Sequence, residues 1–160
     1  MILDKIELIA FQELSEENKL LILNWRNHDN VRKWMYNSET ILSENHFKFI
    51  ESLKTSTTNK YFLVIQDEKK IGVIYFTDID DLKKSTEFGL YANPDIKGVG
   101  KLLMDIICDY AFKKMSYNKL IAEVFDSNKR AIDLYINKSF KPVKTKIVDK
   151  RKIICMELIK

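Results

Sequence analysis

Three runs of β-favouring residues follow one another in the middle of the chain, and they constrain its fold more than any other feature. Residues 60–66 (KYFLVIQ) and 70–79 (KIGVIYFTDI) are joined by polar residues 67–69, and a third run, 85–93 (STEFGLYAN), follows after another polar turn. Short polar turns between β-rich runs are typical of antiparallel hairpins. The sequence therefore predicts a three-stranded meander that ends at Pro94.

Helical patterns precede this meander. Alternating residues at 5–11 predict a first strand. Ser15, followed by two glutamates, begins a helix, because its side chain can cap the helix and the acids favour its positive end. A short second helix begins at Asp29 or Asn30, and Ser43 caps a third.

After Pro94, helical and strand patterns alternate. The expected elements are, in order, a helix, a strand, a helix and two strands, at residues 100–115, 120–125, 128–138, 140–143 and 152–159. The strand at 120–125 is mostly apolar, which is typical of a strand covered on both faces. A strand–helix–strand crossover links parallel strands. The sequence thus predicts an α/β (α+β) protein with a mixed sheet, in one domain spanning residues 1–160.

Composition excludes several classes of protein. The chain has 160 residues, 46% of them hydrophobic and 31% charged, which is enough apolar mass for one folded domain. The two cysteines, Cys108 and Cys155, belong to no cluster with metal-ligand spacing, so we expect neither a metal site nor a disulfide. No apolar run is long enough to span a membrane, and the first residues lack a signal-peptide pattern. We therefore expect a cytoplasmic protein without a membrane partner.

Charge is spread unevenly. The net charge is +4, and the excess of basic residues lies in the second half of the chain. A basic half suits an anionic ligand, although a solvated lysine-rich face is the simpler explanation. The basic segment 138–152 lacks interleaved stacking aromatics, so nucleic acid is not an expected partner.

Two of the four glycines, Gly98 and Gly100, lie in one loop between the third strand of the meander and the next helix. Glycines let a ligand approach the backbone, and the free N–H groups at a helix start attract an anion. Lys97 and Lys101 add positive charge. The loop is a candidate pyrophosphate site, with a plain strand–turn–helix connection as the alternative. It is no P-loop, because no Gly-Lys-Ser/Thr follows.

A second signal lies in the helix at 128–138. Asn128, Ala131 and Tyr135 share one stripe of this helix, where a polar group, a small residue and a phenol can line a ligand groove. A single half-buried tyrosine is more often a packing residue. Taken alone, this stripe therefore leaves both roles open.

Together, these two segments resemble the GCN5-related N-acetyltransferase (GNAT) superfamily. The first resembles its acetyl-CoA loop, Q/R-x-x-G-x-G/A, and the second its N-x-x-A-x-x-L-Y-x-x-x-G-F motif. Asp95 replaces the usual Gln or Arg, and Ser139 replaces the usual Gly. The resemblance covers nearly the whole chain. It implies a central, mostly antiparallel sheet of about seven strands flanked by helices and splayed between the strands at 86–92 and 120–125.

The same resemblance implies acetyl-CoA as cosubstrate, without a metal. The main chain of the strand at 90–92 would pair with the pantetheine arm, and the loop amides would hold the pyrophosphate. Tyr135 would protonate the leaving thiolate. The expected cofactor-binding residues are Leu90, Tyr91, Ala92, Lys97, Gly98, Val99, Gly100, Lys101 and Asn128.

Aromatic, Met, Arg and His residues gather in the N-terminal helical region, as WRNH, WMY and HFKFI. Rings that stack and cations that bind diphosphate suit a nucleotide, although such residues more often belong to a core. With the meander and the glycine loop, this combination resembles, over about residues 20–140, the N-acetyltransferases of pseudaminic acid biosynthesis, a pathway for flagellin glycosylation. Those enzymes acetylate the 4-amino group of UDP-4-amino-4,6-dideoxy-N-acetyl-β-L-altrosamine.

This narrower resemblance implies an acceptor site. Arg26 and His46 would face the UDP, and Thr77 would help to hold the nucleotide. The expected apolar wall around the deoxysugar methyl consists of Met35, Tyr36, Phe49 and Tyr91.

A base must accept the proton of the sugar ammonium. Glu123 interrupts the apolar strand at 120–125, where burial would raise the pKa of a carboxyl group and suit it for this role. Glu87 is the second candidate, and either could instead be a structural hydrogen-bond partner. We expect direct transfer in a ternary complex, in which an N–H near Tyr91 stabilises the oxyanion and Tyr135 is the acid.

Two alternatives stay open. One is an acetyltransferase for a protein N-terminus or another small amine, and the other is a non-catalytic acetyl-CoA-binding module. The sequence determines neither the stereochemistry of the sugar nor the oligomeric state, for which a homodimer is one option.

Overall fold

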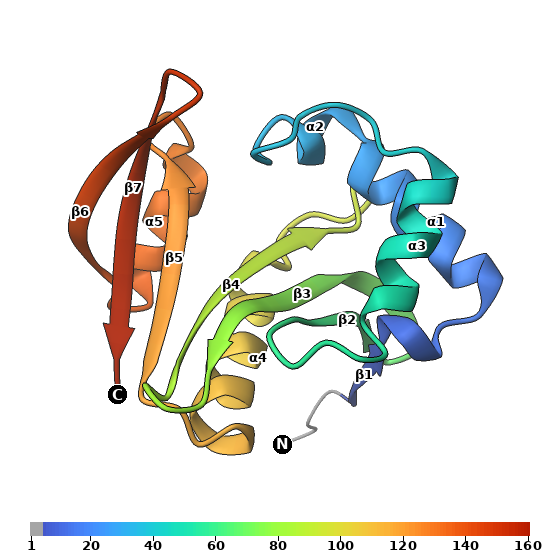
Figure 1. The fold of residues 1–160 in the computed structure, drawn as a ribbon, viewed down its shortest axis with the longest axis horizontal. Helices are drawn as coiled ribbons and strands as arrows, with labels where there is room; N and C mark the ends of the chain where they lie inside the picture. Colours follow the sequence, from blue (N-terminus) through green and yellow to red (C-terminus); the bar gives the residue numbers. More distant parts are fainter. Residues whose placement is uncertain (1–4) are drawn as a thin grey trace.

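A computed structural model describes residues 5–160, and all the strands in this range belong to one seven-stranded sheet (Figure 1). The strand order is β1-β2-β3-β4-β5-β7-β6. The strands are β1 (Ile6–Ala10), β2 (Lys60–Gln66), β3 (Lys69–Asp80), β4 (Ser85–Ala92), β5 (Lys119–Phe125), β6 (Lys141–Val148) and β7 (Arg151–Ile159). The helices are η1 (Phe11–Glu13), α1 (Glu16–Asn27), α2 (Asp29–Arg32), α3 (Ser43–Ser52), α4 (Gly100–Asp109), the π-helical η2 (Tyr110–Lys114) and α5 (Lys129–Asn137).

This element order confirms the prediction, and local chemistry explains most boundaries. The side chain of Ser15 accepts a hydrogen bond from the Asn18 amide and caps α1. Asp67 and Glu68 have φ values of 48° and 71°, as a two-residue hairpin turn between β2 and β3 requires.

The last hairpin differs from the prediction. The sequence predicted strands at 140–143 and 152–159, whereas β6 extends to Val148 and β7 begins at Arg151. Asp149 and Lys150 have φ values of 49° and 64°, so they form a tight turn. The lysine-rich half of β6 was missed because this outer strand is largely exposed and has little apolar alternation.

The sheet splits between β4 and β5, as the family resemblance implied. These two strands are parallel and pair only from Ser85 to Glu87 with Lys119 to Ile121. Beyond that point β4 pairs with β3 alone, and in Figure 1 the group β5, β7 and β6 stands apart from the end of β4. The edge of β4 that faces β5 therefore has unpaired backbone groups.

The two faces of the sheet bury different helices. Ile74 and Phe76 of β3 pack on one face with the side chains of α4 and α5. Val73 and Tyr75, which alternate with them, pack on the other face with α1 and α3. This alternation along β3 follows from the period of a strand.

Candidate active site

A cavity of about 300 Å³ lies on the face of the sheet that α1 and α3 cover. Residues from η1, α1, α3, the loop between α2 and α3, and strands β2 to β4 line it. They are Phe11, Arg26, Met35, Tyr36, Asn37, Ile41, His46, Phe49, Tyr61, Tyr75 and Tyr91. The structure thus brings together all but two of the residues that the sequence assigned to the acceptor.

The two exceptions are Thr77 and Glu87. They are cross-strand partners on β3 and β4, next to the point where the pairing of β4 with β5 ends. Thr77 therefore does not line the cavity from which the sequence expected it to hold the nucleotide.

Stacked tyrosines form much of the cavity wall, and the sequence analysis missed two of them. Tyr61 and Tyr75 are direct cross-strand partners, and their rings stack at 4.7 Å between centroids. The turn between β2 and β3 does not reveal this pair, because the register shifts between Val64 and Ile65 and only this shift brings Tyr61 opposite Tyr75. A Cβ atom on Gly89 would lie only 2.1 Å from the Tyr75 ring, so a glycine is required there.

Arg26 places a guanidinium group in the wall of the cavity. Its Nη2 donates a hydrogen bond to the carbonyl of Asn37 at 2.9 Å, whereas its buried Nη1 has no partner among the described residues. A buried donor without an acceptor is costly. The unpartnered N–H groups are therefore suited to an acceptor atom of a ligand.

The environment of His46 favours its neutral form. Burial lowers its pKa, and its Nε2 lies 2.8 Å from the carbonyl of Lys19, to which a neutral ring donates. Burial thus disfavours the cationic form in which the sequence expected His46 to face a diphosphate beside Arg26. Its ring still lines the cavity.

Glu123 of β5 is held by two partners from distant parts of the chain. The Tyr36 hydroxyl donates to Oε1 at 2.5 Å, and the Lys146 ammonium contacts Oε2 at 2.5 Å. Burial alone would raise the pKa of Glu123, but the hydrogen bonds from Lys146 and Tyr36 outweigh it and lower the pKa. The expectation of a raised pKa at Glu123 is therefore wrong. The sequence of residues 120–125 does not show that Lys146 lies beside Glu123 in the folded protein.

Glu87 has the property that was expected of Glu123. Burial, together with the negative charges of Glu123 and Asp78, raises the pKa of Glu87 to about 7. A carboxyl group with this pKa is matched to proton transfer near neutral pH.

The strand and loop expected to hold acetyl-CoA have suitable backbone geometry. Leu90, Tyr91 and Ala92 pair only with β3, so their other edge is available to an extended ligand. Leu103 is the first residue of α4 whose amide bonds to a carbonyl, that of Val99, so the amides of residues 100–102 precede the helical ladder.

The loop before α4 is shaped by Gly98 and Asn93. Gly98 has a φ of +81°, which glycine adopts without strain. The Asn93 side chain accepts from the Asp95 amide and donates to the Lys70 carbonyl, which fixes the start of the loop. Asp95, which replaces the usual Gln or Arg, is exposed.

The helix α5 places Asn128 and Tyr135 as the stripe predicted. Asn128 Oδ1 accepts from the Ala131 amide at 3.2 Å, so this side chain caps α5, and its NH₂ group is left for a ligand. Tyr135 packs edge-on against Phe88, the first residue of β4 beyond the pairing with β5, at 5.6 Å between centroids. Burial raises the pKa of Tyr135, so the phenol keeps the proton that an acid must donate.

Ser139, which replaces the usual glycine before Phe140, adopts the backbone conformation of that glycine. Ser139 has a φ of 73°, the left-handed conformation for which the family pattern uses glycine. The turn therefore accepts a serine side chain, as this sequence requires.

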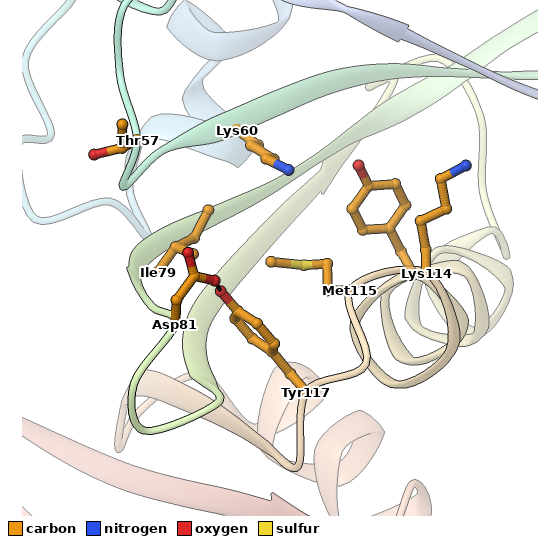
Figure 2. Close-up of a pocket in the computed structure, with 8 residues that line it drawn as sticks. Thr57, Lys60, Ile79, Asp81, Lys114, Met115 and Tyr117 are labelled. Atoms are coloured by element: carbon orange, nitrogen blue, oxygen red, sulfur yellow. Dashed lines mark hydrogen bonds between the residues drawn. The ribbon is translucent and has the colours of Figure 1, made fainter.

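A second cavity, of about 270 Å³, lies beside η2 and contains none of the predicted site residues (Figure 2). It is lined by Thr57, Lys60, Ile79, Asp81, Tyr110, Lys114, Met115 and Tyr117. The Tyr117 hydroxyl donates to Asp81 there. This contact already satisfies one acidic group of the cavity.

Two kinds of feature are absent from the described residues. Among residues 5–160, no group of three or more His, Cys, Asp and Glu side chains could hold a metal ion. No helix in the same range is long and apolar enough to cross a membrane.

Comparisons with known proteins agree with this geometry. Residues 20–140 match the acetyltransferase (GNAT) family. Two proteins named acetyltransferase PseH, from Campylobacter jejuni strains 81-176 and NCTC 11168, are 44% and 45% identical over 135 residues, which is 84% of this chain and of each relative.

Solved structures give the same result. The crystal structure of C. jejuni N-acetyltransferase PseH in complex with acetyl coenzyme A has a TM-score of 0.80 at 38% identity, over 98% of this chain and 99% of that chain. The spermidine N-acetyltransferase from Vibrio cholerae, in complex with CoA and spermine, has a TM-score of 0.86 at 18% identity, over 96% and 95% of the two chains. This second likeness concerns the fold alone.

Proposed function

The chain belongs to the acetyltransferase (GNAT) family, and from this premise we propose its reaction. It transfers an acetyl group from acetyl-CoA to the 4-amino group of UDP-4-amino-4,6-dideoxy-N-acetyl-β-L-altrosamine, in pseudaminic acid biosynthesis. The similarity to C. jejuni PseH, solved with acetyl coenzyme A, supports the donor and the pathway. Residues 1–160 act as one acetyltransferase domain, because every described strand belongs to the same sheet.

The split sheet and the glycine loop bind the donor. The free edge of β4 at Leu90 to Ala92 pairs with the pantetheine arm as an added strand would. The amides from Lys97 to Lys101 surround the pyrophosphate, since the N-terminus of a helix favours an anion. The NH₂ group of Asn128 adds a side-chain contact from α5.

The aromatic cavity binds the acceptor, and the unpartnered Nη1 of Arg26 is the observation that carries this assignment. A nucleotide sugar offers both flat and anionic groups, which match stacked tyrosines and a guanidinium. A polyamine or a peptide N-terminus is cationic, so Arg26 would repel it. The cavity of about 300 Å³ has the size of a small-molecule site.

Proton transfer uses residues on both sides of the split. The carboxylate of Glu123 attracts the ammonium of the sugar, and Glu87, whose pKa is about 7, takes the proton directly or through a water. An N–H of β4 near Tyr91 stabilises the negative charge that develops on the carbonyl oxygen. Tyr135, which its raised pKa keeps protonated and which lies against Phe88 at the split, donates its proton to the departing thiolate.

A substrate panel tests the reaction. The wild-type enzyme and acetyl-CoA are incubated with the UDP-linked amino sugar, the free amino sugar, spermidine and a peptide N-terminus, and the released CoA is measured. We expect kcat/KM for the UDP-linked sugar to exceed that of the free sugar by at least about 100-fold, because the nucleotide supplies most of the binding energy.

The same panel contains the outcomes that would contradict the proposal. Equal rates with the free and UDP-linked sugars would exclude nucleotide recognition by Arg26. If only the peptide or spermidine is acetylated, the protein is an acetyltransferase for another amine. If no amine is acetylated, the result favours a non-catalytic acetyl-CoA-binding module.

A further inference from the structure

Lys146 lies on β6, an edge strand of the sheet, yet its ammonium group contacts Glu123 on the active-site face. It belongs to β6, whose residues are largely exposed, and it is two strands away from β5 in the order β5-β7-β6. Its side chain extends across β7, and its Nζ atom contacts Oε2 of Glu123 at 2.5 Å. The Glu123 side chain is only 16% exposed and that of Lys146 42%, so the pair is partly shielded from solvent.

The two oxygens of Glu123 have separate partners. Lys146 contacts Oε2, and the Cys155 thiol lies 3.8 Å from the same oxygen. Tyr36 donates to Oε1 at 2.5 Å. Tyr36 in turn lines the acceptor cavity and packs edge-on against Phe125. Lys146 is thus connected to the cavity wall through one carboxylate.

We propose that Lys146 is a positioning residue for the acetyl transfer: by holding Oε2 of Glu123, it directs Oε1 toward Tyr36 and the acceptor amine. This inference rests on the proposed function, because it presumes that an amine enters the cavity beside Tyr36. Without the ammonium, the Glu123 side chain loses its fixed rotamer, and Tyr36 loses a fixed partner.

Lys146 also controls the charge state of the carboxylates. The groups that face Glu123 are Tyr36 from the loop after α2, Glu87 from β4, Lys146 from β6 and Cys155 from β7. Asp78 adds its negative charge beside Glu87. Lys146 is the cation that lowers the pKa of both Glu123 and Glu87. Its removal must therefore raise both pKa values.

The test compares Lys146→Met with Lys146→Arg and with a matched control, Lys144→Met, which removes a lysine from the same strand. We measure kcat and both KM values from about pH 5.5 to pH 9 with the UDP-linked amino sugar. In Lys146→Met, kcat at pH 7 falls about tenfold, which is roughly 1.4 kcal/mol, and the acidic limb of the profile moves to higher pH. The KM for acetyl-CoA does not change, Lys146→Arg restores most of the rate, and Lys144→Met resembles the wild type.

Some outcomes would overturn the proposal. A Lys146→Met enzyme with the wild-type rate and acidic limb would leave Lys146 without a role in the reaction. A variant whose rate falls at every pH, with an unmoved limb and a lowered melting temperature, would show a merely structural lysine.

Carboxyl NMR of the ¹³C-labelled enzyme separates failure of this inference from failure of the proposed function. The Glu123 resonance titrates at higher pH in Lys146→Met than in the wild type, whichever amine is the acceptor. An unchanged titration overturns the inference even if the UDP-linked sugar is acetylated. If the titration shifts in Lys146→Met but the wild-type enzyme acetylates another amine, the proposed substrate is contradicted. The coupling of Lys146 to Glu123 is not.

Discussion

At the scale of single residues, the two carboxylates of the site have opposite environments although they share one face of the sheet. Glu123 has Lys146 and Tyr36 as hydrogen-bond donors, which lower its pKa despite burial. Glu87 is half-buried beside the negative charges of Glu123 and Asp78, and these effects raise its pKa to about 7. Glu123 therefore stays ionised at lower pH, while Glu87 is the stronger base at neutral pH.

This contrast predicts two different pH–rate profiles. A base acts when it is deprotonated, so the wild-type rate rises with pH through about 7. Glu87→Gln loses this limb and lowers kcat by about 10²–10⁴. Glu123→Gln removes a negative charge beside Glu87, so the limb remains but moves to lower pH. Profiles at saturating substrates check both variants, and a Glu123→Gln enzyme that loses the limb would return the role of base to Glu123.

Tyr135 provides the second prediction at this scale. Tyr135→Phe keeps the packing against Phe88 and Phe140 but cannot donate a proton. We expect kcat to fall by about 10²–10⁴, with little change in the KM for acetyl-CoA. Tyr110→Phe, which removes a phenol from the second cavity, is the control. A fully active Tyr135→Phe enzyme would mean that the thiolate departs without this acid.

At the scale of elements, the site depends on how β4 meets its two neighbours and on the loop that follows it. β4 pairs with β3 along most of its length but with β5 only from Ser85 to Glu87. The first pairing sets Tyr75 over Gly89 and so forms the acceptor cavity. Because the pairing of β4 with β5 ends at Glu87, the following edge of β4 is available to acetyl-CoA in the proposed complex.

Gly89→Ala tests the packing of β3 on β4. The added Cβ would lie 2.1 Å from the Tyr75 ring, so the ring must leave its place in the cavity wall. We expect a loss of about 1–3 kcal/mol in the free energy of unfolding and a rise in the acceptor KM. Urea denaturation and steady-state kinetics measure these effects. The double variant Gly89→Ala/Tyr75→Ala should recover stability but not acceptor affinity, and a single variant with wild-type values would contradict the contact.

Gly100→Val tests the loop before α4. A Cβ atom at Gly100 meets only Leu134 at 3.5 Å, an ordinary contact, so the fold tolerates it. The branched side chain nevertheless occupies space beside the amides that would hold the pyrophosphate. Calorimetry should show at least about tenfold weaker acetyl-CoA binding, or roughly 1.4 kcal/mol. Unchanged affinity in a normally folded variant would place the pyrophosphate elsewhere.

At the scale of the whole molecule, the proposed donor and acceptor sites lie at different parts of β4 and have few residues in common. The donor site is the edge of β4 that faces β5, and the acceptor site is the cavity on the sheet face that α1 and α3 cover. Tyr91 links them, because its main chain belongs to the free edge and its side chain lines the cavity. Such an arrangement suits a ternary complex, in which both substrates are bound before transfer.

Thermal unfolding with ligands tests this arrangement. A ligand at about 100 times its Kd stabilises the folded state by about 2.7 kcal/mol. CoA and the UDP-linked amino sugar, which cannot react with each other, should together raise the melting temperature more than either does alone. Mutually exclusive stabilisation would contradict a ternary complex and favour an acetylated enzyme as intermediate.

The sequence by itself determined the element order, the meander, the glycine loop and the stripe from Asn128 to Tyr135. These features are local: a strand, a turn or a helix start depends on residues within a few positions, and each motif lies in one contiguous segment. It also indicated most of the acceptor residues, through the family resemblance.

Only the tertiary structure decided how distant residues change one another. The pairing of Tyr61 with Tyr75, the need for Gly89 and the lowered pKa of His46 depend on strand register and burial. The lowered pKa of Glu123, where the sequence predicted a raised one, depends on Tyr36 and on Lys146, which extends across β7 from an edge strand. The raised pKa of Glu87 depends on its burial and on the neighbouring carboxylates. A pKa is set by the charges and solvent within a few ångströms, and no local pattern in the sequence encodes which residues those are.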